Sequence, residues 1–545
     1  MPERTSVITD LKQITDNPEI NRKIEFELVC CGINGDYYNP KSVQIAFDYS
    51  SGSDNIGHSE AFYVGESRWL LRISVSSPGK YSGKLSVLLN GSEAESRLLE
   101  FCVADSENRR GVLSVEPINR RVFAFENGEL FNAIGHNLAW GDKTQPVEYY
   151  REICEKLHRH GANWTRLWLT TEWFLSLIAK NAAPDDFSAS LTEAETLDRI
   201  MEIFEEYGIY VQLVLFNHSN LKEKTGPITD RNWHDFSFNS ATNGGYLESP
   251  SEFFTDDRAK RDVKKYLRYI VSRWGYSCNI LCYELFNEAG AAEANSTDIA
   301  DWHGEMAEYL RGIDSRKHMI TTSSATPVYP LIYDDRFDFI NHHRYGNISN
   351  VYQIISDVSW CAECYGKPVL LSECGAAWTA DSAVDRTVIH QHIWAGLMCG
   401  SAGTGCQWYW EKIDALPNEE GYKDYLYAAE FAKRIPWNRS GHRFVTGEEI
   451  SLNPKDANVL GYINNDYAYL WFYDPTYTFT YRNDGTAGNT WIKLSLKSGD
   501  YSIVWYNTAK GIFSKPELYT VTNGILRICV PEFHHDIALS IEGVK

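Results

Sequence analysis

The chain is short of positive charge. Its 545 residues include 52 Lys and Arg against 73 Asp and Glu, which gives a formal net charge of −21. A protein that binds a phosphate backbone needs clustered Lys and Arg side chains. The charge balance therefore argues against nucleic acid as a partner, while the 43% hydrophobic share is that of an ordinary folded protein.

Long apolar runs are also missing. No stretch approaches the roughly 20 apolar residues that a membrane-spanning helix needs, so we expect no membrane partner. The first residues, MPERTSVITDLKQITDNPEI, contain no apolar segment of the kind found in a secretory signal. We therefore expect a cytoplasmic protein. A secreted protein is the alternative, because a chain whose signal had been removed would start in the same way.

The cysteines do not indicate a metal or redox site. Cys361 and Cys364 have the spacing of a redox motif, but they follow a predicted helix instead of a strand, so idle thiols are the better explanation. The 12 Cys are scattered and lie mostly in apolar runs, as Cys282, Cys399 and Cys406 do, which is typical of reduced, buried thiols. A zinc ribbon needs two close Cys pairs, and Cys278 with Cys282 has the wrong spacing. Glycine motifs for a dinucleotide or a nucleoside triphosphate are missing too. We therefore expect neither a metal nor a cofactor.

Aromatic residues, by contrast, are abundant at 14%, with 17 Trp. Large hydrophobic cores would account for many of them. Another use is as stacking platforms for sugar rings, which have apolar faces and polar edges. Stacking on sugars becomes the better explanation if the chain also contains residues that can cleave a glycosidic bond.

Both ends of the chain are predicted to form β-domains. Up to about residue 115, short strand-like runs such as RKIEFELVC, VQIAFDY and GKLSVLL are separated by turn sequences. After about residue 437 the same pattern returns, for example in YAYLWFYD and YSIVWYN. We predict an N-terminal β-sandwich over 1–115 and a C-terminal one over 438–545, with homo-oligomer formation through these domains as an option.

The middle of the chain, 116–437, alternates helices and strands. Segments at 150–157, 197–204, 263–270 and 351–358 repeat apolar residues at the spacing of an amphipathic helix. Eight apolar runs alternate with helices: FNAIGHN, TRLWLT, YVQLVLF, ILCYELF, HMITTS, FDFINHH, PVLLSE and GTGCQWYW. Eight such units in roughly 300 residues fit a (β/α)8 TIM barrel. An open doubly wound sheet is the alternative.

Two glutamates end two of these predicted strands. Glu288 follows the fourth strand, and Glu373 ends the seventh. Active sites of such barrels lie at the carboxyl ends of the strands, where strands four and seven face each other across the mouth. Hydrolysis of a glycosidic bond requires two opposed carboxyl groups, one to attack the anomeric carbon and one to protonate the leaving oxygen. A single glutamate would be better explained as a surface or capping residue, but two opposed ones favour catalysis.

With four further motifs, these glutamates make residues 120–435 resemble the retaining glycoside hydrolases of clan A, most closely family 5. The motifs appear in order as Gly135–His136–Asn137, Arg166, Asn287–Glu288, His343–Arg344–Tyr345, Glu373, and Trp408 or Trp410. The resemblance implies that Glu288 is the acid/base and Glu373 the nucleophile. It also places the following residues at the substrate: Asn137, Arg166, Asn287, His343, Tyr345, Trp408 and Trp410. One departure is Tyr283, where the family usually has Trp.

Several of the substrate residues have an expected physical role. We expect Asn287 to donate to the sugar 2-hydroxyl, and Tyr345 to hydrogen-bond the nucleophile Glu373. One of Trp408 and Trp410 should form an aromatic floor beneath the sugar. Alternation along a strand would turn both indoles to the same side, and Trp408 is the preferred candidate.

The charges of the site should be set by its neighbours. Arg166 should keep the pKa of Glu373 low, while the negative charge of Glu373 should keep Glu288 protonated. Glu284 lies roughly 13 Å deeper along the same strand as Glu288. We expect it to pair with an arginine such as Arg166 rather than to take part in catalysis.

A long segment, 217–254, follows the third predicted strand and is rich in polar and aromatic residues that suit sugars. We expect Asn217 and His218 at its start to bind substrate, and the segment to close one end of the cleft. A closed end would favour exo-action, with one monosaccharide released at a time. A self-packed Ω-loop is an equally good explanation of the segment.

The sequence therefore predicts a retaining β-glycosidase that acts on short oligosaccharides or glycosides of gluco or manno configuration. A secreted endo-β-glycanase of the same fold, a mannanase or a glucanase, is the first alternative. A non-catalytic carbohydrate-binding barrel is the second, and the presence of both glutamates argues against it.

Overall fold

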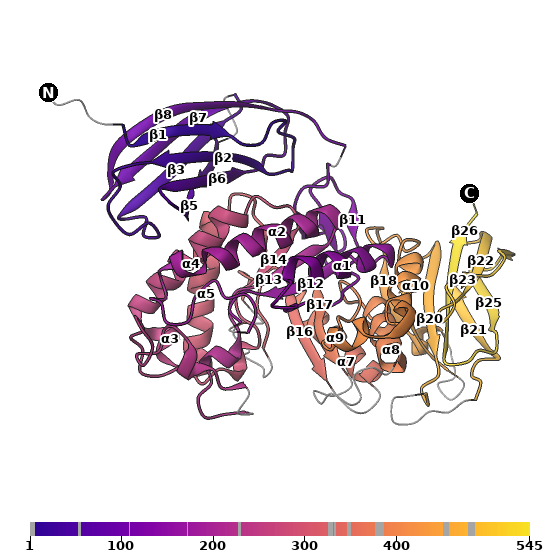
Figure 1. The fold of residues 1–545 in the computed structure, drawn as a ribbon. Helices are drawn as coiled ribbons and strands as arrows, with labels where there is room; N and C mark the ends of the chain where they lie inside the picture. The colour runs from indigo at the N-terminus through magenta and orange to yellow at the C-terminus, as the bar shows by residue number, and fades with distance from the viewer. Residues whose placement is uncertain are drawn as a thin grey trace.

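The computed structural model describes residues 6–52, 56–107, 109–171, 173–226, 230–324, 331, 334–345, 350–375, 386–450, 457–477 and 485–544. The chain forms a TIM-like core that lies between two separate groups of antiparallel sheets (Figure 1). This confirms the prediction of a multidomain chain with a TIM-like core and β-structure at both ends. The predicted limits 1–115, 116–437 and 438–545 remain predictions. No helix in the described ranges is both long and apolar enough to span a bilayer.

Two four-stranded antiparallel sheets make up the N-terminal part, with the orders β1-β2-β6-β5 and β4-β3-β7-β8. Their strands are β1 (Ile8–Gln13), β2 (Ile24–Cys30), β3 (Val43–Ser50), β4 (Ile56–Glu60), β5 (Phe62–Gly65), β6 (Arg68–Ile73), β7 (Gly79–Leu89) and β8 (Ser92–Val103). Side chains alternate along β2, where Ile24, Phe26, Leu28 and Cys30 are buried and the residues between them are not. The buried faces of the two sheets share one hydrophobic core.

Six regular strands build most of the core: β12 (Trp164–Trp168), β13 (Tyr210–Val214), β14 (Ile280–Glu284), β15 (Met319–Thr321), β16 (Ile340–Tyr345) and β17 (Val369–Gly375). Strands β12 to β15 pair in parallel in chain order, and β16 pairs in parallel with β17. Single parallel bridges join the remaining neighbours: Ser323 to Asn341, Cys374 to Gln407, Gln407 to His136, Gly403 to Ala133, and Gly135 to Trp164. The predicted first and eighth strands therefore take part as bridged segments rather than as continuous ladders.

Glycines allow the close approach of these bridged segments. A Cβ atom at Gly403 would lie 2.3 Å from the carbonyl oxygen of Ala133, and one at Gly135 would lie 2.2 Å from the ring of Trp164. Any side chain at either position would push the two segments apart. The Gly-rich run before Gln407 thus serves close packing.

A small sheet closes the end of the core opposite the strand carboxyl ends. It has the order β11-β10-β9 and consists of β9 (Leu113–Val115), β10 (Phe123–Phe125) and β11 (Leu130–Phe131). Its apolar side chains share a cluster with Trp164, Tyr210 and Met319, the first residues of three core strands. The open end of the core is therefore the end at which the strands terminate.

The four predicted helical segments lie within α1 (Pro146–Arg159), α2 (Leu191–Tyr207), α4 (Asp257–Trp274) and α7 (Asn350–Tyr365). The structure also describes the helices α3 (Glu252–Thr255), α5 (Ser296–Ile313), α8 (Arg386–Met398), α9 (Trp410–Asp414) and α10 (Lys423–Ala432). The periodic pattern missed α8, since nearly every side chain after its first turn is buried. This helix lies between β17 and the C-terminal sheet, so it has no polar face.

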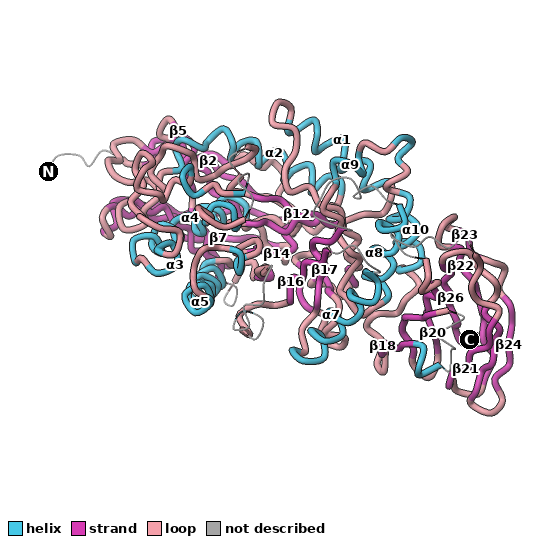
Figure 2. The backbone as a smooth tube through the Cα atoms, turned by 90° about the horizontal axis from the view of Figure 1, so that it is seen from below, coloured by secondary structure: helices cyan, strands magenta, loops and turns pink. Residues whose placement is uncertain are grey.

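The C-terminal part contains one large and one small antiparallel sheet. The large one has the order β18-β19-β20-β26-β22-β23, with β24 also paired to β22, and the small one is β21-β25. The strands are β18 (Arg443–Thr446), β19 (Asn458–Ile463), β20 (Tyr467–Tyr473), β21 (Thr490–Ser495), β22 (Gly499–Asn507), β23 (Ile512–Phe513), β24 (Glu517–Val521), β25 (Ile525–Val530) and β26 (Asp536–Gly543). Seen from below, these sheets form the end of the molecule opposite the N-terminus (Figure 2).

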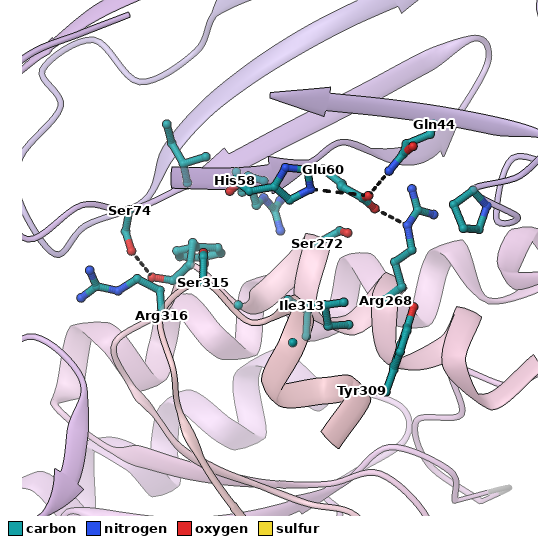
Figure 3. A pocket seen from close by; sticks show the side chains of 18 residues that line it. Gln44, His58, Glu60, Ser74, Arg268, Ser272, Tyr309, Ile313, Ser315 and Arg316 are labelled. Carbon is teal, nitrogen blue, oxygen red and sulfur yellow. Dashed lines mark hydrogen bonds and ion pairs between the residues drawn. The ribbon is translucent and has the colours of Figure 1, made fainter. Parts of the chain in front are cut away.

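Arg72 of β6 fastens the N-terminal sheets to the core. It donates to both carboxylate oxygens of Asp198 in α2, at 2.7 and 3.0 Å, and to the carbonyl oxygen of Arg273 in α4 at 3.2 Å. A cavity of about 350 Å³ lies along the same interface, where Glu60 accepts hydrogen bonds from Gln44 and from Arg268 of α4 (Figure 3). The charged groups of this interface thus satisfy one another.

His390 of α8 fastens the C-terminal sheet. Its Nδ1 lies 2.8 Å from Asp424 of α10, and its Nε2 lies 2.8 Å from Asp536 of β26. Burial by itself lowers the pKa of His390, but the charges of Asp536 and Asp424 and their hydrogen bonds raise it to about 10. A cation between two carboxylates therefore joins the core to the sheet.

This junction predicts a loss of stability at alkaline pH. Because the folded pKa of His390 lies above its unfolded value of about 6.5, the stabilisation is complete below that pH and disappears as the pH rises through about 10. At neutral pH, His390→Gln should lower the free energy of unfolding by on the order of 3–5 kcal/mol. The change leaves the buried Asp536 without its cation and Asp424 with only Arg386, 3.6 Å away. Urea denaturation of both proteins at several pH values measures the effect. Identical pH dependence in the wild type and the variant would contradict it.

Candidate active site

Three ionisable side chains meet at the open end of the core. Glu288 comes four residues after β14, His343 lies in β16 and Glu373 lies in β17. One carboxylate oxygen of each glutamate and a ring nitrogen of His343 all lie within 4.8 Å of one another. Carboxyl groups in retaining glycosidases stand about 5–5.5 Å apart, and those in inverting ones about 6.5–9.5 Å. An oxygen-to-oxygen distance of at most 4.8 Å between the two glutamates is compatible with the retaining range.

Arg166 of β12 holds the deeper part of the site. Its side chain is fully buried, and its Nη1 donates to Oε2 of Glu373 at 2.8 Å. Its Nη2 donates to Glu284 at 2.9 Å and to Oδ1 of Asn287 at 2.7 Å. Glu284 also accepts from Gln212 at 2.7 Å, so it is a core acid held by several donors. The expected pairing of Glu284 with Arg166 is present.

Both oxygens of Glu373 have a donor. Arg166 occupies Oε2, and the hydroxyl group of Tyr345, which lies in β16 beside it, donates to Oε1. Burial and then the charge of Glu373 raise the pKa of Tyr345 well above its usual value, so the phenol keeps its proton and remains a donor. The carboxylate is therefore held in one orientation, as a nucleophile requires.

Glu288 and His343 form an ion pair with Oε1 and Nδ1 3.0 Å apart. Burial alone raises the pKa of Glu288, but the hydrogen bond and charge of His343 outweigh it and lower the pKa to about 2. Burial alone lowers the pKa of His343, whereas the charge of Glu373 and the bond to Glu288 raise it. Both directions oppose the expectation that Glu288 is protonated in the absence of substrate, and they favour the proton on His343.

The backbone at Glu288 has a left-handed conformation, with φ of 54°. Its N–H group donates to Oγ of Ser323 at 2.9 Å, and that hydroxyl donates to Glu284 at 2.6 Å. A non-glycine residue in this region is strained by on the order of 1–3 kcal/mol and needs such support. No pattern in the sequence indicates this bend, which turns the Glu288 side chain towards the other two groups.

The structure assigns Asn137 and Asn217 structural positions. Asn137 is fully buried, and its amide nitrogen donates to the carbonyl oxygens of Ser372 and Gln407 at 3.1 Å each. Asn217 is 1% exposed, and its side chain caps the N–H group of Ser219. Both amides hold the ends of core strands together, and the substrate contacts expected of them stay predictions. His218, by contrast, lies at the site, with Nδ1 3.6 Å from Oε2 of Glu288.

The aromatic wall differs in part from the prediction. Trp408 is half-buried, and its ring meets those of Trp140 and Trp168 at centroid distances of 5.4 and 5.5 Å. Trp410 is only 1% exposed because it begins α9, so strand alternation does not apply to it. Trp140 and Trp173, whose centroids lie 5.3 Å apart, extend the wall outward. Both were missed, since they lie in loops and belong to no motif.

The segment 217–254 packs mainly on itself. Its Trp233, Phe236 and Phe238 are buried, and Phe238 meets Phe253 at a centroid distance of 5.1 Å. Tyr246 donates to Asp262 of α4 at 2.7 Å, which turns its hydroxyl group away from the cleft. Among the described residues, the self-packed Ω-loop is therefore the better explanation, and the segment gives no support to a closed cleft end.

Glu288, His343 and Glu373 are also residue types that bind metal ions, and they are close enough to share one. Both oxygens of Glu373 already accept hydrogen bonds, however, and a cation there would lie next to the guanidinium of Arg166. Repulsion between those charges makes the cluster a poor metal site. The donor set suits a carboxylate nucleophile better.

Comparisons of sequence lead to fungal mannanases. No protein-family model matches the chain. Mannan endo-1,4-β-mannosidase A of Podospora anserina is 24% identical over 227 residues, which are 38% of this chain and 56% of the relative. The enzyme of the same name from Hypocrea jecorina is 21% identical over 270 residues, 45% of this chain and 56% of the relative. The chain therefore spans about half the length of these curated relatives.

Comparisons of structure extend over more of the chain. A Bacteroides vulgatus protein described as a candidate glycoside hydrolase matches with a TM-score of 0.69 and 14% identity, over 97% of this chain and 100% of that one. A family 5 glycoside hydrolase from the same species matches with a TM-score of 0.53 and 14% identity, over 80% and 93%. At these identities the likeness is one of fold. The resemblance to family 5 glycoside hydrolases that the motifs predicted is confirmed.

The buried position of Arg166 predicts a large effect on stability. In Arg166→Met, Glu284 and Glu373 lose their cation inside the core, so the free energy of unfolding should fall by on the order of 3–5 kcal/mol. Adding Glu284→Gln should recover part of the loss, since it removes one uncompensated charge. Urea denaturation of the single and double variants measures both effects. A loss below about 1 kcal/mol in Arg166→Met would show that the guanidinium is not a central support.

Proposed function

We propose that the chain hydrolyses β-glycosidic bonds with retention of configuration, and that its preferred substrates are manno-configured saccharides. The observation that carries the proposal is that Glu288 and Glu373 lie close together but have different hydrogen-bond partners. Glu373 accepts hydrogen bonds from Arg166 and Tyr345 and lies 3.5 Å from Nδ1 of His343, whereas Glu288 is bonded to that nitrogen at 3.0 Å. One carboxylate is equipped to attack and the other to exchange a proton.

In the first step of this mechanism, the loss of charge at Glu373 promotes the transfer of a proton from His343 to Glu288. Glu373 attacks the anomeric carbon and forms a covalent glycosyl ester, so its negative charge disappears. That charge is the main influence that raises the pKa of His343. As it is lost, the proton on Nδ1 passes over 3.0 Å to Oε1 of Glu288. The carboxyl group then turns about its Cγ–Cδ bond, so that this proton faces the leaving oxygen and is donated to it. Attack and protonation are thereby linked through one histidine.

In the second step, Glu288 acts as the base and Glu373 is the leaving group. Glu288, now a carboxylate beside His343, removes a proton from water, and the hydroxide displaces Glu373 from the sugar. The charge returns to Glu373, where Arg166 and Tyr345 stabilise it. Two inversions at the anomeric carbon give a product with the configuration of the substrate.

The choice of sugar rests on the relatives. Both curated proteins reported above are named as mannan endo-1,4-β-mannosidases, which favours mannosides over glucosides. Those names also favour cleavage within a polysaccharide chain. The exo-action predicted from the segment 217–254 gains no support from the described contacts of that segment, which packs mainly on itself. We therefore propose endo-action on β-1,4-linked mannosides, with exo-release as the second candidate.

The acid/base role of Glu288 predicts a dependence on the leaving group. Glu288→Ala should lose on the order of 100-fold or more in kcat/KM on a natural oligosaccharide, whose leaving group needs a proton. On a dinitrophenyl glycoside the glycosylation step should change far less, since that leaving group needs none. Pre-steady-state and steady-state kinetics on both substrates measure the difference. Glu248→Ala, an exposed residue of the segment 217–254, is the matched control. Equal losses on both substrates would reject the role.

The substrate proposal predicts a product pattern. With β-1,4-linked mannohexaose and the corresponding glucose oligomer as substrates, the mannose oligomer should be cleaved at least tenfold faster. The new reducing ends should appear first as the β-anomer in proton NMR, because retention preserves the configuration. Early di- and trisaccharides would support endo-action. Early release of single sugars would favour exo-action instead, and an α-anomer formed first would contradict the retaining mechanism.

A further inference from the structure

A line of polar groups runs outward from the acid/base to the segment after β13. His218 begins the short helix η2 (His218–Leu221) and points its Nδ1 at Asn287, 3.2 Å away. Its Nε2 lies 3.3 Å from Oδ2 of Asp230. The same oxygen of Asp230 accepts from Nζ of Lys222 at 2.6 Å. These residues surround the acid/base Glu288 on the side away from His343.

The hydrogen bonds of Asn287 determine which nitrogen of His218 carries the proton. An arginine can only donate, so the atom of Asn287 that faces Nη2 of Arg166 at 2.7 Å must be its oxygen. The amide nitrogen of Asn287 therefore faces His218 and donates to Nδ1. Nδ1 must accept, and the proton of a neutral His218 lies on Nε2, from which it points at Asp230.

Lys222 keeps this arrangement neutral. A carboxylate beside an imidazole ordinarily draws a second proton onto the ring. Here Lys222 balances the charge of Asp230, since its Nζ lies 2.6 Å from Oδ2 of that carboxylate. If His218 were charged, its Nδ1–H would face the NH2 group of Asn287, donor against donor. The ring could relieve that clash only by turning towards Oε2 of Glu288, 3.6 Å away.

We propose that Asp230 and Lys222 are positioning residues that hold His218 as the neutral tautomer protonated on Nε2. In that form His218 fixes the amide of Asn287 and leaves Oε2 of Glu288 free to meet the leaving oxygen. Oε1 of Glu288 is already bonded to His343, so Oε2 is the oxygen available to a substrate. The proposal rests on the proposed function of the site, and it assigns a task to the outer part of the segment 217–254.

The charged groups around His218 come from several elements. Glu288 follows β14, and Lys222 and Asp230 belong to the segment after β13. Behind Asn287 lies Arg166 of β12, and on the far side of Glu288 lies His343 of β16. Because each of these groups is part of the site, changes at Asp230 or Lys222 should also alter the pH dependence of catalysis.

Nitrogen NMR of the histidine rings tests the tautomer directly. In the wild type at neutral pH, His218 should show a protonated Nε2 and an unprotonated Nδ1. Asp230→Ala removes the acceptor, so the Nδ1–H tautomer should become populated. Lys222→Met leaves Asp230 unbalanced, so His218 should become a cation. The two variants therefore change the ring in different directions. Asp235→Ala is the matched control, since Asp235 lies in the same segment but pairs with Lys180 instead.

Kinetics provide the second readout. Both variants should lower kcat on an oligosaccharide between about tenfold and a hundredfold through misplacement of Asn287 and Glu288. They should leave KM within about twofold and shift the pH profile, whereas Asp235→Ala should change neither. Loss of fold stability alone would not alter a ring tautomer or a pH profile.

The two readouts separate this inference from the proposed function. An Nδ1–H tautomer in the wild type, or an unchanged tautomer in both variants, would overturn the inference even if the wild type hydrolyses mannosides. Wild-type kcat and pH profile in both variants would overturn it as well. Absence of hydrolysis by a folded wild type, with the expected tautomer in the NMR spectrum, would overturn the proposed function and not the tautomer assignment.

Discussion

A buried guanidinium organises the site. Arg166 donates to Glu373, Glu284 and Asn287 at once, and so joins β12 to β14 and β17 across the open end of the core. The guanidinium group is planar and its N–H donors point in fixed directions, so it can hold three partners in a defined arrangement. The ammonium group of a lysine has no such fixed geometry. The orientation of the Asn287 amide follows from this contact, and the tautomer that we propose for His218 rests on that orientation. The cost of burying this charge is offset only because every partner is in place.

The ionisable groups of the site act as one system. Glu288 and His343 share a proton, and the charge of Glu373 helps to determine where that proton lies. The mechanism that we propose does not need a glutamate that is protonated at rest. It needs a proton held nearby and released when the nucleophile loses its charge. The flanking sheets contribute in another way, through buried ion pairs at Arg72 and His390 that attach them to the core.

Much of the site could be predicted because family motifs occur at the ends of apolar runs. Glu288, Glu373, Arg166, His343 and Tyr345 meet as expected, and so do Arg166 and Glu284. The remainder depends on features that periodicity does not carry. Helix α8 is buried on all sides, and Trp410 starts a helix where a strand was expected. The sequence does not show whether a polar side chain is buried, because burial depends on the whole fold. Asn137 and Asn217, whose amides are buried, were therefore interpreted as binding residues.

The central claim is that Glu373 forms a covalent bond to the sugar, and trapping that intermediate tests it most directly. A 2-fluoro-β-mannosyl fluoride reacts with the nucleophile of a retaining enzyme, and the covalent intermediate that forms is hydrolysed slowly. Intact-mass spectrometry followed by peptide mapping should find one fluoromannosyl group, attached to the peptide that contains Glu373, and none in Glu373→Gln. A label on another residue, or no label from a fluoroglycoside that the enzyme hydrolyses with inversion, would contradict the account.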